Sequence, residues 1–160
     1  MNLLDKLKKD TILLPVESST QAGIIHELLV HLQNLAILSA TSNLFVNITN
    51  NEKSLPSAAG RGVAYPHSTS LEVDELVCVL GISKNGIDFH SPDGQLCHLI
   101  LMTLSPIEDP CEHRKFITRF QTMLNNPKLR SNLLDATKNS EVIDIVQKWE
   151  EEESMMDDIS

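Results

Sequence analysis

The sequence predicts an α/β domain in which a mixed sheet is covered by helices. Two observations predict this class. Residues 75–82 and 96–104 are nearly continuous apolar runs, which at this length are typical of strands buried on both faces. Residues 20–35 and 116–124, on either side of these runs, repeat their apolar residues at helical spacing. The length of 160 residues suits one domain, and the sequence contains no internal repeat or low-complexity linker.

The N-terminal third is predicted to hold an extended segment and two helices. Residues 10–16 are short and apolar, which favours an extended entry segment. A helix is predicted over residues 20–34, and Ser19 or Thr20 suits its start because a hydroxyl accepts hydrogen bonds from free backbone amides. A weaker helix is predicted from about Ser42.

Turn residues divide the middle of the chain. Residues 54–68 are rich in Gly, Pro and Ser and predict a loop, a short strand at Val63–Tyr65 and a second loop. After the first apolar run, Lys84–Gly86 predicts a turn, residues 87–89 a short extended piece, and Ser91–Gly94 a second turn before the other strand.

Three helices are predicted for the last third. Asp109 and Pro110 suit a helix start, since Asp accepts bonds from free amides and Pro fits the first helical position. This helix runs to about Leu124. Asn125–Pro127 ends it and begins a short helix, and Ser140 is predicted to cap the last one.

The formal charge is −9, but six acidic charges lie within residues 150–160, which leaves −3 for residues 1–149. We expect residues 1–149 to form the domain and residues 150–160 to form an acidic tail in which a helix end fades into disorder. The negative balance argues against binding to nucleic acid or to anionic membrane surfaces, because both select clustered Lys and Arg.

Other features predict a cytoplasmic protein without membrane insertion. No apolar run approaches the ~18 residues that a membrane-spanning helix needs, and the N-terminal residues lack the pattern of a secretory signal. Three cysteines are too few and odd in number for a disulfide framework, so we expect reduced thiols at Cys78, Cys97 and Cys111.

His67 is the first candidate site residue. It follows Gly60-Arg61-Gly62-Val63-Ala64-Tyr65-Pro66, where two glycines permit close approach of a ligand and Pro66 stiffens the backbone before the histidine. A neutral imidazole on such a loop suits covalent transfer of a group. The residues themselves leave an ordinary Pro-His loop open as the alternative. Histidines predicted to be surface or satisfied side chains are His26, His31, His90 and His98.

His113 is the second candidate. It falls in the first turn of the predicted helix after Pro110, where free amides and the helix dipole favour anions. A histidine there suits a hydrogen bond to a phosphoryl oxygen, although it also fits a plain helix start.

The ordered motifs resemble a known family. The stretch SAAGRGVAYPH, which ends at His67, is similar to the active-site signature of the fructose/mannitol-type enzyme IIA domains of the bacterial sugar phosphotransferase system. The likeness continues through GIDFHSPDGQLCHLILMTLSP and through the helical segments up to Trp149. A chain of this length looks most like the nitrogen-regulatory branch. The resemblance implies a phosphotransferase/anion transport protein-like fold, with a mixed parallel and antiparallel sheet of about four to five strands flanked by helices.

The resemblance also implies roles for individual residues. His67 matches the phosphorylated histidine and His113 the second histidine, which supports the phosphoryl group. Ser57, Gly60, Arg61 and Gly62 belong to the supporting loop. The expected donor is an HPr-like phosphocarrier protein, and the phosphorylation state is expected to control a target protein that the sequence does not identify. No metal and no organic cofactor is expected.

Departures from the family pattern weaken the predicted phosphate site. Asn51 stands where the family usually has an arginine, which removes a charge-assisted donor to phosphate. Lys53 and Arg61 are the cations nearest in sequence that could replace it. Tyr65 stands where a branched aliphatic residue is usual. Besides the regulatory phosphocarrier, two alternatives therefore stay open: a binding module with impaired or lost phosphorylation, and the IIA component of a split sugar transport system.

Overall fold

The computed structural model describes residues 2–107 and 110–159. Its sheet has six strands in the order β1-β5-β6-β3-β2, and β4 also pairs with β6. The pairs β5–β6 and β2–β3 are antiparallel, whereas β1–β5, β3–β6 and β4–β6 are parallel. The strands are β1 (Ile12–Leu13), β2 (Ala58–Gly60), β3 (Val63–Ala64), β4 (His67–Thr69), β5 (Val77–Ile87) and β6 (Cys97–Ser105). The predicted mixed α/β class is confirmed, with a sheet slightly larger than expected.

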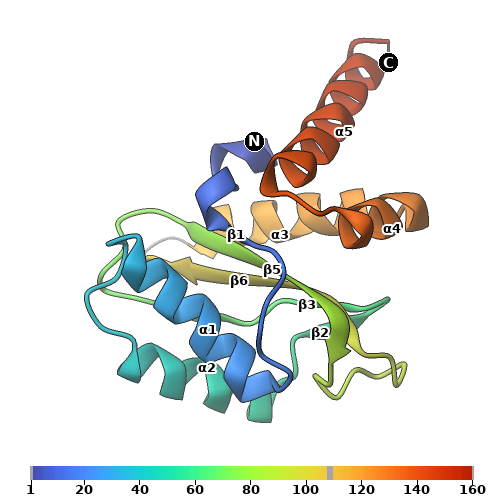
Figure 1. Cartoon of the computed structure of the whole chain (residues 1–160). Helices are drawn as coiled ribbons and strands as arrows, with labels where there is room; N and C mark the ends of the chain where they lie inside the picture. Colours follow the sequence, from blue (N-terminus) through green and yellow to red (C-terminus); the bar gives the residue numbers. More distant parts are fainter. Residues whose placement is uncertain (1, 108–109, 160) are drawn as a thin grey trace.

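Helices cover both faces of this sheet (Figure 1). One face carries α1 (Gln21–Asn34) and α2 (Ser42–Ser54), and the other carries α3 (Pro110–Leu124), α4 (Pro127–Asp135), α5 (Asn139–Ile159) and the N-terminal 3-10 turns Leu3–Asp5 and Lys9–Thr11. Thr20 caps α1 as predicted, since its hydroxyl accepts the Gly23 amide at 3.0 Å. The predicted start residue Asp109 lies outside the described residues.

The central strand β6 separates two apolar layers, because neighbouring side chains of a strand point to opposite faces. Leu99 and Leu101 pack in one layer with Phe116 of α3. Ile100 and Met102 pack in the other layer with the buried side chains of α1. Burial on both faces explains why the sequence of β6 is an almost unbroken apolar run.

The stretch predicted as loop, strand and loop holds three strands. The predicted strand is β3, but β2 precedes it and β4 follows it. The prediction of a loop at His67–Thr69 is wrong because β4 is held by parallel pairing with β6. The sequence of these residues has no apolar pattern that would predict this pairing.

The turn predicted at Lys84–Gly86 is also replaced by strand. β5 continues through Ile87, and its register against β6 shifts between Ile82 and Ile87, which is the mark of a β-bulge. Gly86 supplies the left-handed conformation (φ 85°), and its amide donates to the Ser83 hydroxyl at 3.0 Å. Turn-forming residues therefore bend the strand instead of ending it.

The acidic C-terminal segment is helical. Residues 150–159 continue α5, so the expected fading into disorder is wrong for them. Glu150 is only 6% exposed, and its carboxylate accepts hydrogen bonds from the Leu3 amide and from the guanidinium of Arg119. Arg119 also lies 4.9 Å above the ring of Trp149. The first acidic residue of this segment thus ties α5 to α3 and to the N-terminus.

Candidate functional site: a histidine pair beside β4

The backbone of His67 is held on two sides. Its strand partner on β6 is Thr103, whose amide donates to the Pro66 carbonyl at 3.1 Å. From α2, the side-chain amide of Asn51 donates to the His67 carbonyl at 3.1 Å. The residue that replaces the usual arginine thus touches the site, but through the backbone of the histidine.

The ring of His67 is exposed and its orientation is fixed. Nδ1 lies 3.0 Å from the carbonyl oxygen of Tyr65. Because a carbonyl oxygen only accepts hydrogen bonds, Nδ1 carries the proton in this contact. In the neutral ring Nε2 then keeps its lone pair, so this atom is chemically able to act as a nucleophile.

His113, in the first turn of α3, lies against His67. The two ring centroids are 5.3 Å apart with an angle of 36° between the rings. Burial is the main cause that lowers the pKa of half-buried His113 below its usual 6.5, and the charges of His67 and Arg114 lower it further. His113 is therefore neutral at neutral pH, so it can donate one hydrogen bond and accept another.

The supporting loop is fixed by buried polar contacts. Glu52 is 7% exposed, and its carboxylate accepts hydrogen bonds from the Gln21 side chain at 3.1 Å and from the Ser57 amide at 3.2 Å. Ser57 in turn accepts the Tyr65 amide at 3.2 Å. The predicted site residue Ser57 thus holds the strand that leads to the histidine.

Gly60 and Gly62 shape the tight turn between β2 and β3. Both have positive φ angles, 83° and 79°, which glycine adopts without strain. The Gly62 carbonyl accepts the amides of His98 and Leu99 at 2.8 and 3.0 Å, which joins the turn to β6.

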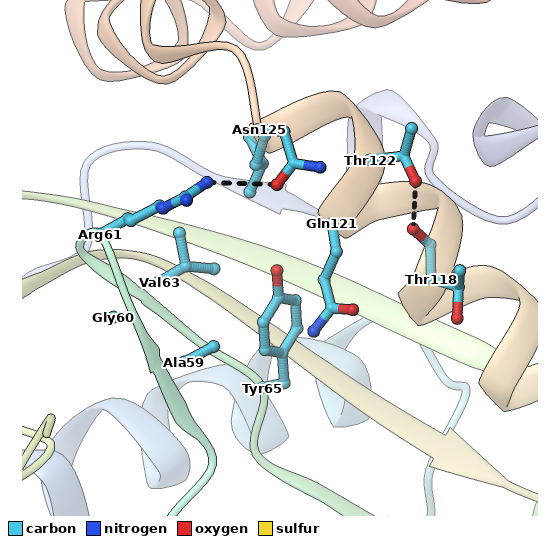
Figure 2. Close-up of a pocket in the computed structure, with 10 residues that line it drawn as sticks. Ala59, Gly60, Arg61, Val63, Tyr65, Thr118, Gln121, Thr122 and Asn125 are labelled. Atoms are coloured by element: carbon cyan, nitrogen blue, oxygen red, sulfur yellow. Dashed lines mark hydrogen bonds between the residues drawn. The ribbon is translucent and has the colours of Figure 1, made fainter.

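Arg61, the residue between them, points away from the histidine pair. It lines a pocket of about 350 Å³ between the β2–β3 turn and α3, where its Nη1 donates to Asn125 Oδ1 at 3.2 Å (Figure 2). Asn125 follows His113 by twelve residues, which is about 18 Å along a helix. Tyr65 points its hydroxyl into this pocket, while its ring packs edge-on against Phe120. Burial raises the pKa of Tyr65, so the hydroxyl stays neutral.

The structure therefore divides the predicted residues into two groups. His67, His113 and Asn51 come together, whereas Arg61 and Ser57 serve the neighbouring loop and pocket. Sequence reasoning missed Thr103 as a neighbour of the pair. Its signal is a lone hydroxyl within the apolar run LCHLILMTL, one of the few polar residues buried in a strand.

Within residues 2–107 and 110–159, no three His, Cys, Asp or Glu side chains are placed to share a metal ion. The helices described there include none with the length and hydropathy needed to cross a bilayer. Cys78 and Cys97 are buried free thiols.

The chain is similar to known proteins along most of its length. The family model for the phosphoenolpyruvate-dependent sugar phosphotransferase system, EIIA 2, matches residues 5–149. The fructose-specific EIIABC component of Bacillus subtilis is 30% identical over 148 residues; these are 92% of the chain but only 23% of that protein. A nitrogen regulatory protein of Bradyrhizobium diazoefficiens is 24% identical over 133 residues, which cover 83% of the chain and 86% of that protein.

Solved structures show the same fold. The nitrogen regulatory protein IIA-Ntr from Neisseria meningitidis superimposes with a TM-score of 0.81 at 22% identity, over 89% of this chain and 97% of that one. The mannitol enzyme IIA of Escherichia coli, solved in complex with its phosphorylated enzyme IIB, gives a TM-score of 0.76 at 19% identity, over 89% and 98% of the two chains.

Proposed function

The chain belongs to the EIIA 2 family of the phosphoenolpyruvate-dependent sugar phosphotransferase system, and on this premise we propose that it is a regulatory phosphocarrier. His67 accepts a phosphoryl group from an HPr-like phosphocarrier protein, and the phosphorylated and free forms bind a target protein differently. The observation that carries the proposal is the exposed His67 ring, whose Nδ1 is engaged by the Tyr65 carbonyl and whose Nε2 is free beside a neutral His113.

The transfer exchanges one phosphorus–nitrogen bond for another. The Nε2 lone pair of His67 attacks the phosphorus of the donor phosphohistidine, and the donor nitrogen leaves with the electron pair of its bond. The Nδ1–H of His67 remains bonded to the Tyr65 carbonyl, which disperses the positive charge that develops on the ring. No other covalent bond of the protein changes in this step. The protein therefore contributes by positioning the reacting groups and by stabilising charge.

The surroundings supply donors for the phosphoryl oxygens. His113 lies next to the acceptor ring and is neutral, so its single N–H is available without the cost of burying a cation. Arg114, which is exposed beside it, adds positive charge close enough to lower the pKa of His113. Asn51 contributes a neutral amide where a guanidinium is usual, and this amide donates one hydrogen bond to the His67 carbonyl.

Exposed apolar side chains beside β4 support protein docking. Leu71 is 89% exposed just after β4, and Ile107 is 59% exposed just after β6. Both line one hollow together with Thr69, which lies two residues after His67. A phosphoryl group at His67 adds negative charge at the edge of this surface, which changes its electrostatic fit to a partner.

Phosphorylation with the general enzymes of the system tests the proposal. Incubation of the full chain with phosphoenolpyruvate, enzyme I and HPr should add one acid-labile phosphate, and His67→Ala should abolish it. His113→Ala should keep the site but slow the transfer. If His67→Ala is labelled as well as the wild type, the assignment of the site is wrong.

A binding module without phosphorylation is the second candidate, and Asn51 favours it. Absence of labelling in the wild type, together with retained binding to a target, would select this candidate. The IIA component of a split sugar transport system is a third candidate. Transfer of the label onward to an enzyme IIB, the kind of partner seen with the mannitol relative, would select it.

A further inference from the structure

The pocket between the β2–β3 turn and α3 has no part in the proposed transfer. One wall is the segment from β2 to Tyr65, and the other is the C-terminal half of α3, at the opposite end of that helix from His113 (Figure 2). Its volume is about 350 Å³. Pockets that bind small molecules span about 300–1,000 Å³, so this one has room for a small ligand.

A nearly buried hydroxyl group points into the pocket. Tyr65 is only 7% exposed, and Figure 2 shows its hydroxyl directed into the space between the two walls. The hydrogen bonds that Tyr65 makes with other described residues involve its backbone amide and carbonyl, and none involves the hydroxyl. Since the hydroxyl of a buried tyrosine usually has a partner, this one is available to a polar group of a bound molecule.

The backbone conformation of Arg61 is unusual for an arginine. Its φ angle is 60°, between Gly60 and Gly62, which also have positive φ. This region is disfavoured for residues with a Cβ, and non-glycine residues held there are frequent at functional sites. A glycine would adopt the same angle without strain, so the turn itself does not require an arginine side chain.

The guanidinium of Arg61 keeps donors for an anion. Its Nη1 donates to Asn125 Oδ1 at 3.2 Å, and the ion pairs found among the described residues do not include it. Asp93 accepts the backbone amide of Arg61 at 2.9 Å, which holds the turn, but it does not line the pocket. Of the described residues that do line it, none is acidic. The remaining N–H groups therefore suit one carboxylate or phosphate group.

The other polar groups of the pocket are neutral. From α3, Gln121 and Asn125 contribute side-chain amides and Thr118 contributes a hydroxyl. Amides and hydroxyls can both donate and accept hydrogen bonds, as the hydroxyl groups of a ligand also do. Val63 adds apolar surface from β3. A ligand that matches this lining carries several hydroxyl groups and a single anionic group.

We propose that this pocket binds a small hydroxylated anion, the chemistry that sugar phosphates and sugar acids share. The anionic group pairs with the guanidinium of Arg61, and the hydroxyl groups bond to the Tyr65 hydroxyl and the Gln121 amide. The proposal does not depend on phosphoryl transfer to His67. Tyr65 nevertheless connects the two places, because its hydroxyl lines the pocket and its carbonyl contacts Nδ1 of His67.

Proton–nitrogen NMR titration of the unphosphorylated full chain tests the proposal. The probes are glucose 6-phosphate and gluconate, and their comparison shows whether phosphate or carboxylate is preferred. At least one should cause saturable shifts in the backbone amides of residues 60–62 and in the side-chain amides of Gln121 and Asn125. Inorganic phosphate and glucose each carry only half of the chemistry and should bind at least about tenfold more weakly.

Two variants remove the recognising groups one at a time. Arg61→Gly removes the guanidinium, relieves the backbone strain and should weaken binding roughly tenfold, the range for a charge-assisted hydrogen bond. Tyr65→Phe removes only the hydroxyl and should weaken binding roughly fivefold, as expected for a neutral bond. Lys138→Gln makes the same change in net charge at an exposed residue outside the pocket and should bind like the wild type.

Three results would overturn the proposal. The first is the absence of saturable shifts in the pocket with either probe up to about 10 mM. The second is equal affinity for inorganic phosphate, which would mean that Arg61 attracts any anion. The third is an Arg61→Gly chain that binds as tightly as the wild type. None of these measurements involves phosphorylation of His67, so failure of the phosphocarrier function leaves their outcome unchanged.

Discussion

Replacing Asn51 by arginine tests whether the missing guanidinium limits phosphoryl transfer. Asn51 lies at the site, and its side-chain amide donates to the His67 carbonyl at 3.1 Å. An arginine side chain at this position therefore extends from a backbone that is already close to His67. Its five donors allow one bond to the carbonyl and others to phosphoryl oxygens, and they carry a positive charge that the Asn51 amide lacks. We expect Asn51→Arg to accept phosphate from HPr faster than the wild type.

The magnitude follows from the exposure of position 51. A hydrogen bond between charged partners contributes about 1.5–3 kcal/mol, and solvent screening at the exposed Asn51 selects the lower end. About 1.4 kcal/mol corresponds to a tenfold change, so Asn51→Arg should accelerate the transfer roughly tenfold. Asn51→Ala loses only a neutral bond of about 1 kcal/mol and should slow the transfer about fivefold.

The assay is rapid-quench labelling from phosphorylated HPr, with Asn50→Arg as the matched control. Asn50 is the neighbouring exposed residue of α2, and the control adds the same charge in a direction about 100° away around the helix. Equal acceleration in both variants would attribute the gain to net charge and docking. An Asn51→Arg rate no higher than that of Asn50→Arg refutes the reasoning.

Three further predictions concern stability. Because the pKa of His113 is lowered in the folded chain, the unfolded chain binds a proton first as the pH falls, and the free energy of unfolding decreases below about pH 6.5. Urea unfolding at several pH values should show a steeper decrease for the wild type than for His113→Asn. Glu150→Ala should lower the free energy of unfolding by about 3 kcal/mol because it leaves a guanidinium and an amide unpaired, whereas exposed Glu152→Ala should change it little. Gly86→Ala should unfold at lower urea than Gly94→Ala: both have positive φ, but only at Gly86 would a Cβ meet another atom, at 2.7 Å.

Long elements with their own periodicity were predictable from the sequence. β5, β6, α1 and α3 each bury a face or stripe that leaves a regular pattern of apolar residues. The missed strands β2 and β4 have three residues each, and β4 reads His-Ser-Thr. Such segments become strands only because a distant partner supplies their hydrogen bonds, as Thr103 and its neighbours on β6 do for β4. The local β propensity of these residues does not indicate that pairing.

The site was predictable to a different depth. The residues alone marked His67 and His113 as candidates, and only the likeness to a family joined them. Their ring distance of 5.3 Å depends on where α3 packs on the sheet. Arg61 was offered as a substitute for the missing arginine because it is near His67 in sequence. In the fold it bonds Asn125 at the far end of α3, since a tight turn with two positive-φ glycines redirects it.

In this chain, the contacts that orient the His67 ring are different from the side chains that supply positive charge for a phosphoryl group. The Tyr65 carbonyl and the His67–His113 contact fix the rings without any cation, so the orientation of the His67 ring does not depend on the usual arginine. What the loss removes is attraction for a doubly charged group, which Arg114 supplies only from an exposed position. A chain built this way should be labelled on the correct nitrogen but slowly. The rate therefore distinguishes a weakened phosphocarrier from a binding module, whereas the position of the label distinguishes a correct site assignment from a wrong one.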